Sequence, residues 1–240
     1  NAAMAHQLNE FKAQIDALVN EGMEQEEALY KVLKETIIAS KNIRFEGDGY
    51  SEEWKEEAAR RGLTNICHVP EAIMRFNDPQ SRAVLIGENV FNENELMCRI
   101  EVELEKFTKK VQIESRILGD LAINHIIPTA VTYQNRLLEN LRGLRETFSP
   151  EEYEILGADR KELIKEIQYH ILDIKRMVRE MIEARHIANR KPSQEEKAYS
   201  YEECVRPYME KIREHIDDLE LEIDDEIWPL PKYRELLFNK

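Results

Sequence analysis

Long stretches of helical periodicity with few breakers constrain the fold of this sequence more than any other feature. Between about residues 92 and 148 the one strong helix breaker is Pro128, since isolated glycines are tolerated inside a helix. The apolar side chains step by threes and fours or their sums: Leu96, Ile100, Leu104, Phe107, Val111, Leu118 and Leu121, then Leu137, Leu141, Leu144 and Phe148. A continuous helix of this length would measure about 80 Å, and other helices must cover its apolar stripe.

Two further apolar seams could supply that cover. One consists of Ile164, Ile167, Ile171, Ile174, Val178 and Met181, and the other of Val205, Met209, Ile212, Ile216, Leu219 and Ile223. Alternating steps of three and four are typical of coiled-coil packing. A loop at about 189–193, which contains Pro192, separates the seams, and short polar connections favour antiparallel neighbours. The sequence therefore predicts an all-α fold with a long antiparallel three-helix bundle, coiled-coil-like in its packing.

A smaller, irregular helical subdomain is predicted to precede the bundle. Its first two helices are expected at about 4–20 and 25–41. Ser51 is a candidate N-cap for a short helix that Gly62 ends, and Pro70 and Pro79 are well placed at the start of further short helices.

Three parts of the chain follow from these patterns. Residues 1–91 form the irregular subdomain with the Gly47-Asp48-Gly49 loop, 92–226 form the bundle, and 227–240 form a tail that packs back. At Pro128 we expect the long helix to kink rather than stop, because Ile126, Ile127, Ala130 and Val131 keep the apolar face continuous across the proline.

Charge and cysteine usage narrow the partners and the compartment. With 34 Lys and Arg against 48 Asp and Glu, the net charge is -14, which argues against nucleic acid and against anionic membrane surfaces. The scattered Cys67, Cys98 and Cys204 predict reduced thiols and a cytoplasmic protein. The opening residues 1–4 do not form a signal peptide; we expect a tag remnant, so that the chain is a segment of a longer protein.

Histidine-based sites are weakly supported by the sequence. A di-iron site in a bundle requires two Glu-x-x-His motifs on facing helices, and Glu183 to His186 supplies one. His125 continues the register of Leu118 and Leu121, so we expect a core histidine on the buried stripe rather than a ligand or a base.

Other candidate motifs also have structural interpretations. The acidic run from Asp217 to Glu226 lacks the spacing of a calcium loop and is predicted to be a solvated face, or to meet the basic residues between Lys175 and Lys191 of a neighbouring helix or subunit. The Gly47-Asp48-Gly49 loop matches no phosphate-binding pattern and is predicted to be a tight turn with positive φ. We therefore assign no catalytic, cofactor-binding or metal-binding residue.

Three blocks of the sequence resemble the C-terminal region of type III glutamine synthetases. They are residues 43–54 with the Gly47-Asp48-Gly49-Tyr50-Ser51 loop and Trp54, followed by 57–63; residues 126–130 with Tyr133 and Gln134; and the terminal Trp228-Pro229-Leu230-Pro231-Lys232-Tyr233 tail. The resemblance covers essentially the whole chain. It marks eight residues as structural: Gly47, Gly49, Trp54, Pro128, Trp228, Pro229, Pro231 and Tyr233.

The resemblance implies a parent enzyme that joins ammonia to glutamate, using ATP and a divalent metal such as Mg²⁺, through a γ-glutamyl phosphate. Its catalytic residues would lie in a β-rich domain before residue 1, and no cofactor would bind this segment. Arg44-Phe45-Glu46 echoes a motif of that domain but continues as Gly-Asp-Gly-Tyr, so it receives no catalytic role. The family assembles as stacked hexameric rings.

On this basis we predict a non-catalytic helical region, inactive alone, that packs on its own catalytic domain and on neighbouring subunits and has a structural or assembly role. A free-standing helical scaffold or adaptor protein is the alternative, which a start codon near Met4 would favour. An enzyme with a metal bound inside the helical bundle is a third hypothesis, which the single Glu-x-x-His motif disfavours.

Overall fold

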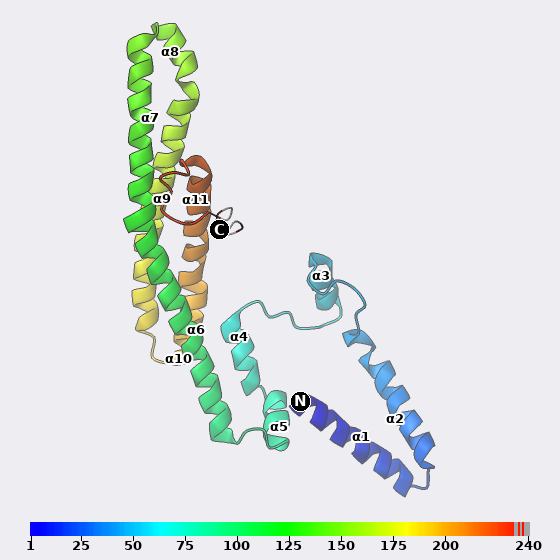
Figure 1. Cartoon of the computed structure of the whole chain (residues 1–240). Coiled ribbons are helices and arrows are strands. Elements are labelled where there is room, and N and C mark those ends of the chain that lie inside the picture. Colours follow the sequence, from blue (N-terminus) through cyan, green and yellow to red (C-terminus); the bar gives the residue numbers. More distant parts are fainter. Residues whose placement is uncertain (233–234, 236, 238–240) are drawn as a thin grey trace. The chain divides into compact units, whose positions relative to one another are not determined.

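The computed structural model describes residues 1–232, 235 and 237, and in these residues all regular structure is helical. The predicted all-α class is therefore confirmed. The chain divides into two compact units, residues 1–103 and 104–240. Figure 1 labels the helices of both units.

Unit 1 is built from short helices and turns. Its elements are α1 (Ala2–Asn20), α2 (Gln25–Ala39), η1 (Ser40–Ile43), α3 (Glu52–Arg60), α4 (Val69–Met74), η2 (Arg75–Asn77), α5 (Pro79–Gly87) and the start of α6 (Glu93–Leu121). Helix α1 packs against α2 and α5. The predicted starts at Pro70 and Pro79 are confirmed, because each proline lies in the first turn of its helix.

Capping interactions fix the ends of these helices. The Ser51 hydroxyl accepts a hydrogen bond from the Trp54 N–H at 3.2 Å, as expected of an N-cap. Gly62 ends α3 with φ +74°, and its N–H bonds to the Ala59 carbonyl while the Leu63 N–H bonds to the Ala58 carbonyl. This pair of bonds is a Schellman motif, which satisfies carbonyls that the helix leaves unpaired.

Unit 2 consists of long helices connected by short turns. After α6 come η3 (Ala122–Ile126), α7 (Ile127–Thr147), α8 (Pro150–Leu156), α9 (Ala158–Asn189), α10 (Gln194–Ser200), η4 (Tyr201–Val205) and α11 (Arg206–Glu222). The chain turns at α8, α9 returns antiparallel along α7, and α11 packs against α9 (Figure 1). The turn at α8 begins with a capping box, in which Ser149 and Glu152 each bond the other's backbone N–H.

The core of unit 2 is formed by the predicted seams. On α9 the buried members are Ile167, Ile171, Ile174, Val178 and Met181, with Ile164 half-buried. On η4 and α11 they are Val205, Ile212, Ile216 and Leu219, with Met209 half-buried, and Ile223 is buried directly after α11. Each such side chain stabilises the fold by roughly 1.5–3 kcal/mol relative to an exposed one.

Two π turns interrupt the α-helical hydrogen bonding. In each of them, a proline directly follows the residue whose N–H closes the turn. In η3 the Ile127 N–H bonds to the Ala122 carbonyl, and Pro128 follows. In η4 the Arg206 N–H bonds to the Tyr201 carbonyl, and Pro207 follows. The long helix thus continues across Pro128, because the wider turn moves the preceding carbonyls away from a ring that would clash with them in an α-helix.

The first π turn also changes which residues are buried, and it corrects the expectation for His125. At the end of η3 and after it the buried positions are Ile126, Ile127 and Ala130, whereas His125 is exposed and Val131 is 41% exposed. A five-residue turn inserts one residue relative to an α-helix, so the buried stripe moves on by one position. The α-helical register extrapolated from Leu118 and Leu121 is therefore wrong at His125.

Candidate functional site

An aromatic–arginine cluster organises the loop that carries the resemblance in unit 1. The Phe45 and Trp54 ring centroids lie 4.1 Å apart, and the Arg61 guanidinium carbon lies 5.6 Å and 5.8 Å from the two centroids. Arg61 also donates to the Arg44 carbonyl at 2.8 Å. Hydrogen bonds from Arg60 and Arg61 lower the pKa of Glu57 to about 2, so this carboxylate is ionised beside the cluster.

The prediction that the Gly47-Asp48-Gly49 loop is a turn with positive φ is wrong. Among the described glycines, positive φ occurs at Gly22 and Gly62, not at Gly47 or Gly49. A Cβ on Gly47 would lie 2.6 Å from Phe45 Cζ, so any other residue there would require the Phe45 ring to move. The turn is closed instead by the Asp48 carboxylate, which accepts from the Tyr50 N–H at 2.9 Å.

An open hollow of about 730 Å³ adjoins the cluster and is lined largely by cations. Its lining residues are Lys41, Asn42, Arg44, Phe45, Glu46, Arg60 and Arg61. Because Arg60 and Arg61 are already bonded to Glu57, Lys41 and Arg44 supply the remaining positive charge. With four cations and one carboxylate in its lining, the hollow suits contact with a carboxylate-bearing surface.

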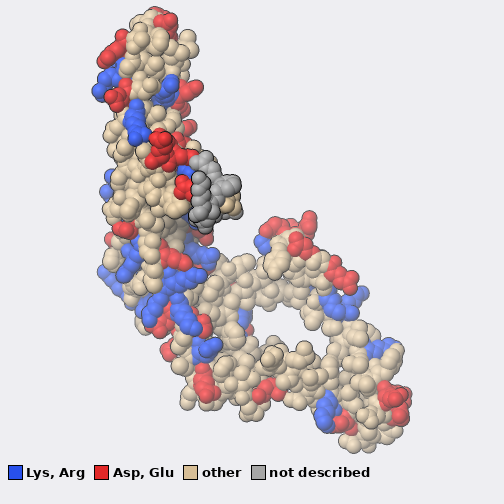
Figure 2. Space-filling model, viewed as in Figure 1, with Lys and Arg blue, Asp and Glu red and all other residues tan. Residues whose placement is uncertain are grey.

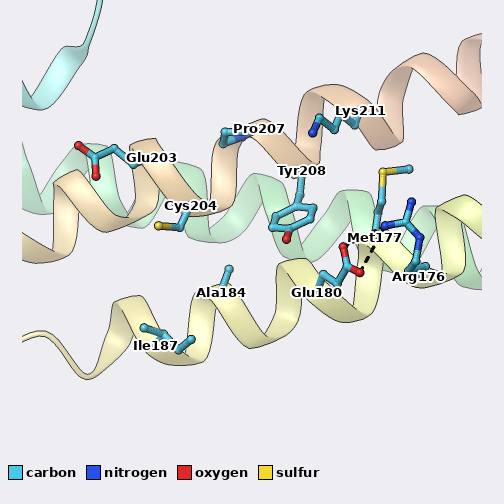
Figure 3. A pocket seen from close by; sticks show the side chains of 10 residues that line it. All are labelled: Arg176, Met177, Glu180, Ala184, Ile187, Glu203, Cys204, Pro207, Tyr208 and Lys211. Carbon is cyan, nitrogen blue, oxygen red and sulfur yellow. Dashed lines mark hydrogen bonds and ion pairs between the residues drawn. The ribbon is translucent and has the colours of Figure 1, made fainter.

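A groove of about 490 Å³ lies between α9 and the η4–α11 segment in unit 2. Figure 3 shows Tyr208 projecting from α11 toward Glu180 of α9, with Ala184 and Ile187 farther along the facing helix. The Arg176 and Glu180 side chains bond each other along α9 at 3.3 Å. Glu203 of η4 and Lys211 of α11 add one charge of each sign on the facing side, and the groove is a surface feature of the helix pair.

The His170 and His215 side chains meet between α9 and α11. Their Nδ1 atoms lie 2.9 Å apart and the rings pack edge to face, with centroids 5.1 Å apart. Asp218 joins them, and one ligand atom from each residue lies within 4.8 Å of the others. A Glu-x-x-His pattern does not reveal this group, because no glutamate lies three residues before His170 or His215. The available signal was that His170 and His215 each precede a buried isoleucine of a facing seam.

The other acidic and histidine candidates are dispersed. Glu183 and His186 are exposed on α9. In the acidic run, Asp217 pairs with Arg213, Asp224 with Arg136 and Asp225 with Lys232. In the predicted basic stretch, Arg176 bonds Asp173 and Glu180 of its own helix.

Burial affects the pKa of Glu222, which belongs to the acidic run. Desolvation raises its pKa, and the nearby Glu166 and Asp218 charges raise it further. Its Oε2 is buried with no hydrogen-bond partner among the described residues.

The predicted tail residues contribute unequally. Trp228 is 8% exposed and belongs to the core of unit 2, with the Lys232 Nζ 5.8 Å from its ring centroid. Lys232 donates to the Glu220 carbonyl at 2.6 Å, which holds the tail against α11. Pro229 and Pro231 are exposed, and Tyr233 lies outside the described residues.

In the part of the chain that the structure describes, no helix combines the length and the apolar character needed to cross a membrane.

Comparison with known proteins identifies the family. The model of the glutamine synthetase C-terminal domain matches residues 28–145. A glutamine synthetase of Bacteroides fragilis is 71% identical over 240 residues, which is all of this chain and 33% of that protein. A type-3 glutamine synthetase of Dictyostelium discoideum is 28% identical over 88% of this chain and 29% of its own length, and a glutamine synthetase of Butyrivibrio fibrisolvens is 32% identical over 50% of this chain and 17% of its own.

The chain thus spans about a third, or less, of the length of these relatives. It is homologous to a glutamine synthetase along its whole length and to a type-3 enzyme along 88% of it, and it belongs to that family through the glutamine synthetase C-terminal domain at residues 28–145.

Proposed function

We propose that this chain is the non-catalytic, C-terminal helical region of a type III glutamine synthetase, where it has a structural and assembly role. The observation that carries the proposal is the match of residues 28–145 to the glutamine synthetase C-terminal domain, together with 71% identity to one third of a glutamine synthetase. The parent enzyme would join ammonia to glutamate with ATP and Mg²⁺ in the cytoplasm. A free-standing scaffold is disfavoured, because the identity runs through the whole chain into a much longer relative.

The proposed parts follow the sequence pattern. Residues 92–226 form an extended antiparallel three-helix bundle with coiled-coil-like packing, and the 227–240 tail packs on it through residues 227–232, the continuous part that the structure describes. The burial of the α9 and α11 seams and the place of Trp228 in the same core support this division.

Exposed apolar side chains on α1 and α2 support an interaction role for residues 1–91. They include Met4, Leu8, Val19, Leu29, Leu33, Ile37 and Ile38, each at least 38% exposed. On the face visible in Figure 2 uncharged residues cover most of α1 and α2, whereas Lys, Arg, Asp and Glu are interspersed along unit 2. An apolar face of this extent is typical of a protein interface, and we assign it to the catalytic domain or a neighbouring subunit.

Catalytic independence is tested by comparing the 240-residue chain with the full-length synthetase. Glutamate-dependent phosphate release from ATP should be measured for both at equal molarity, with ammonia present. We expect activity in the full-length protein and none in the chain alone. Glutamine formation by the chain would overturn the proposal that this region is non-catalytic.

The assembly role is tested in the full-length enzyme by two kinds of change. Removal of residues 92–240, or the pair Leu29→Ser and Leu33→Ser, should alter the assembly size seen by multi-angle light scattering. Lys34→Ser on the same helix is the matched control, since Lys34 is exposed and charged. An unchanged assembly in both the truncated and the doubly substituted enzyme would contradict an assembly role.

A further inference from the structure

The His170, His215 and Asp218 side chains are placed by two helices as one group. His215 and Asp218 are three residues apart on α11, so they lie on the same face of that helix. His170 approaches from α9, which packs against α11. Both histidines are half-buried and Asp218 is exposed, so the group has one side in the helix interface and one side open to solvent.

The spacing of the two imidazoles suits a metal ion of the first transition row. Metal–nitrogen distances of about 2.0–2.1 Å put two ligand nitrogens about 2.9 Å apart at a right angle and about 3.3 Å apart in a tetrahedron. The observed Nδ1 to Nδ1 distance is 2.9 Å. Two imidazoles and one carboxylate are ligands that Zn²⁺ accepts, with water completing the shell.

We propose that His170 Nδ1, His215 Nδ1 and a carboxylate oxygen of Asp218 bind a divalent transition-metal ion of the zinc type, which links α9 to α11. In the absence of the ion, one Nδ1 carries a hydrogen and donates it to the other. Binding moves that hydrogen to Nε2 of the same ring, so both Nδ1 lone pairs face the ion and no other group changes its protonation. Asp218 closes onto the ion by rotation of an exposed side chain.

This site is separate from the metal chemistry expected of the parent enzyme. The resemblance places the catalytic residues of the parent enzyme in a β-rich domain before residue 1, whereas this group uses imidazoles within the helical C-terminal region. The test of this site is therefore independent of the proposed assembly role. It uses the 240-residue chain alone, so that any bound ion must be held by residues of this chain and not by the rest of a synthetase.

The experiment measures Co²⁺ and Zn²⁺ binding to the chain after treatment with EDTA and alkylation of the exposed Cys67, Cys98 and Cys204. Equilibrium dialysis gives the stoichiometry, and the visible spectrum of Co²⁺ reports nitrogen ligation and geometry. His170→Gln, His215→Gln and Asp218→Asn test the ligands. His186→Gln on α9 and Asp217→Asn on α11 are the matched controls, since both residues are exposed and lie outside the group. Far-UV circular dichroism follows folding in every variant.

We expect one ion per chain for the unmodified sequence and for both controls, with a loss of affinity of more than about tenfold in each ligand variant. Binding should weaken as the pH is lowered, because protons compete with the ion for its ligand atoms. Bound Zn²⁺ should also raise the melting temperature, since it binds the folded state. Absence of a bound ion in the unmodified chain, or equal affinity in His170→Gln or His215→Gln, would overturn the site. Asp218→Asn keeps the test decisive if a histidine variant misfolds, because its side chain is exposed.

Discussion

Deletion of one residue from the first π turn should destabilise unit 2 through Pro128. Without Asn124, residues 122–126 can form an α-helical turn, and the residues before and after it keep their faces. Pro128 would then lie in an α-helix interior, where its ring clashes with a carbonyl of the preceding turn at a cost of about 3 kcal/mol. For a unit of this size that corresponds to a melting temperature lower by roughly 10 °C.

A double-mutant cycle, followed by urea and thermal unfolding, measures the coupling between Pro128 and the Asn124 deletion. Pro128→Ala alone should change stability by less than about 1 kcal/mol, because the π turn already accommodates the ring. Combined with the Asn124 deletion, Pro128→Ala should restore most of the lost stability, giving a coupling of about 2–3 kcal/mol.

A second deletion serves as the control for this cycle. Glu139 is exposed on α7, away from the π turn, so its removal shifts the rest of that helix out of register. Pro128→Ala should not rescue it. If Pro128→Ala also fails to improve the Asn124 deletion, the proline is not the reason for the π turn, and the argument is refuted.

Three further changes test burial, capping and charge. Ile126→Ala should lower the free energy of unfolding by about 2–5 kcal/mol while His125→Ala changes it by less than about 0.5 kcal/mol, as chemical denaturation of the two variants will show. Ser149→Ala, which removes the capping box of α8, should cost about 1 kcal/mol by the same measurement. Glu222 has a raised pKa in the folded state, so its contribution to stability falls as pH rises through that pKa. Glu222→Gln should therefore raise the melting temperature at pH 7 and lose this advantage near pH 4; a gain that is the same at both pH values would exclude the charge as its cause.

The long helices could be predicted because their apolar periodicity and their burial have the same cause. Ile167, Ile171 and Ile174 repeat at the spacing of one helix face, and that face is buried. Local caps could be predicted for the same kind of reason, since Ser51 and Gly62 satisfy backbone groups a few residues away. In both cases the residues that determine the structure lie within a few residues of one another in the sequence.

The features that could not be predicted depend on contacts between residues far apart in the sequence or on the position that one side chain takes. His170 and His215 are 45 residues apart, and only the register between α9 and α11 brings their rings together. The role of Gly47 depends on the position that the Phe45 ring takes above it, which residue propensity does not specify. The α8 turn was within reach, because Ser149 followed by proline and Glu152 has the form of a capping box.

The geometry of the buried stripe along α6 and α7 explains the first π turn. Leu118, Ala122, Ile126, Ala130 and Gln134 all face the interior, each four residues after the last. In an α-helix, residues advance by about 100° each, so this stripe would rotate by about 160° and its end would face solvent. One inserted residue removes about 100° of that rotation and leaves about 60°, which fits within the apolar stripe of a packed helix. The π turn therefore keeps α6 and α7 on one core, and Pro128 lies where the hydrogen bonding has already been displaced.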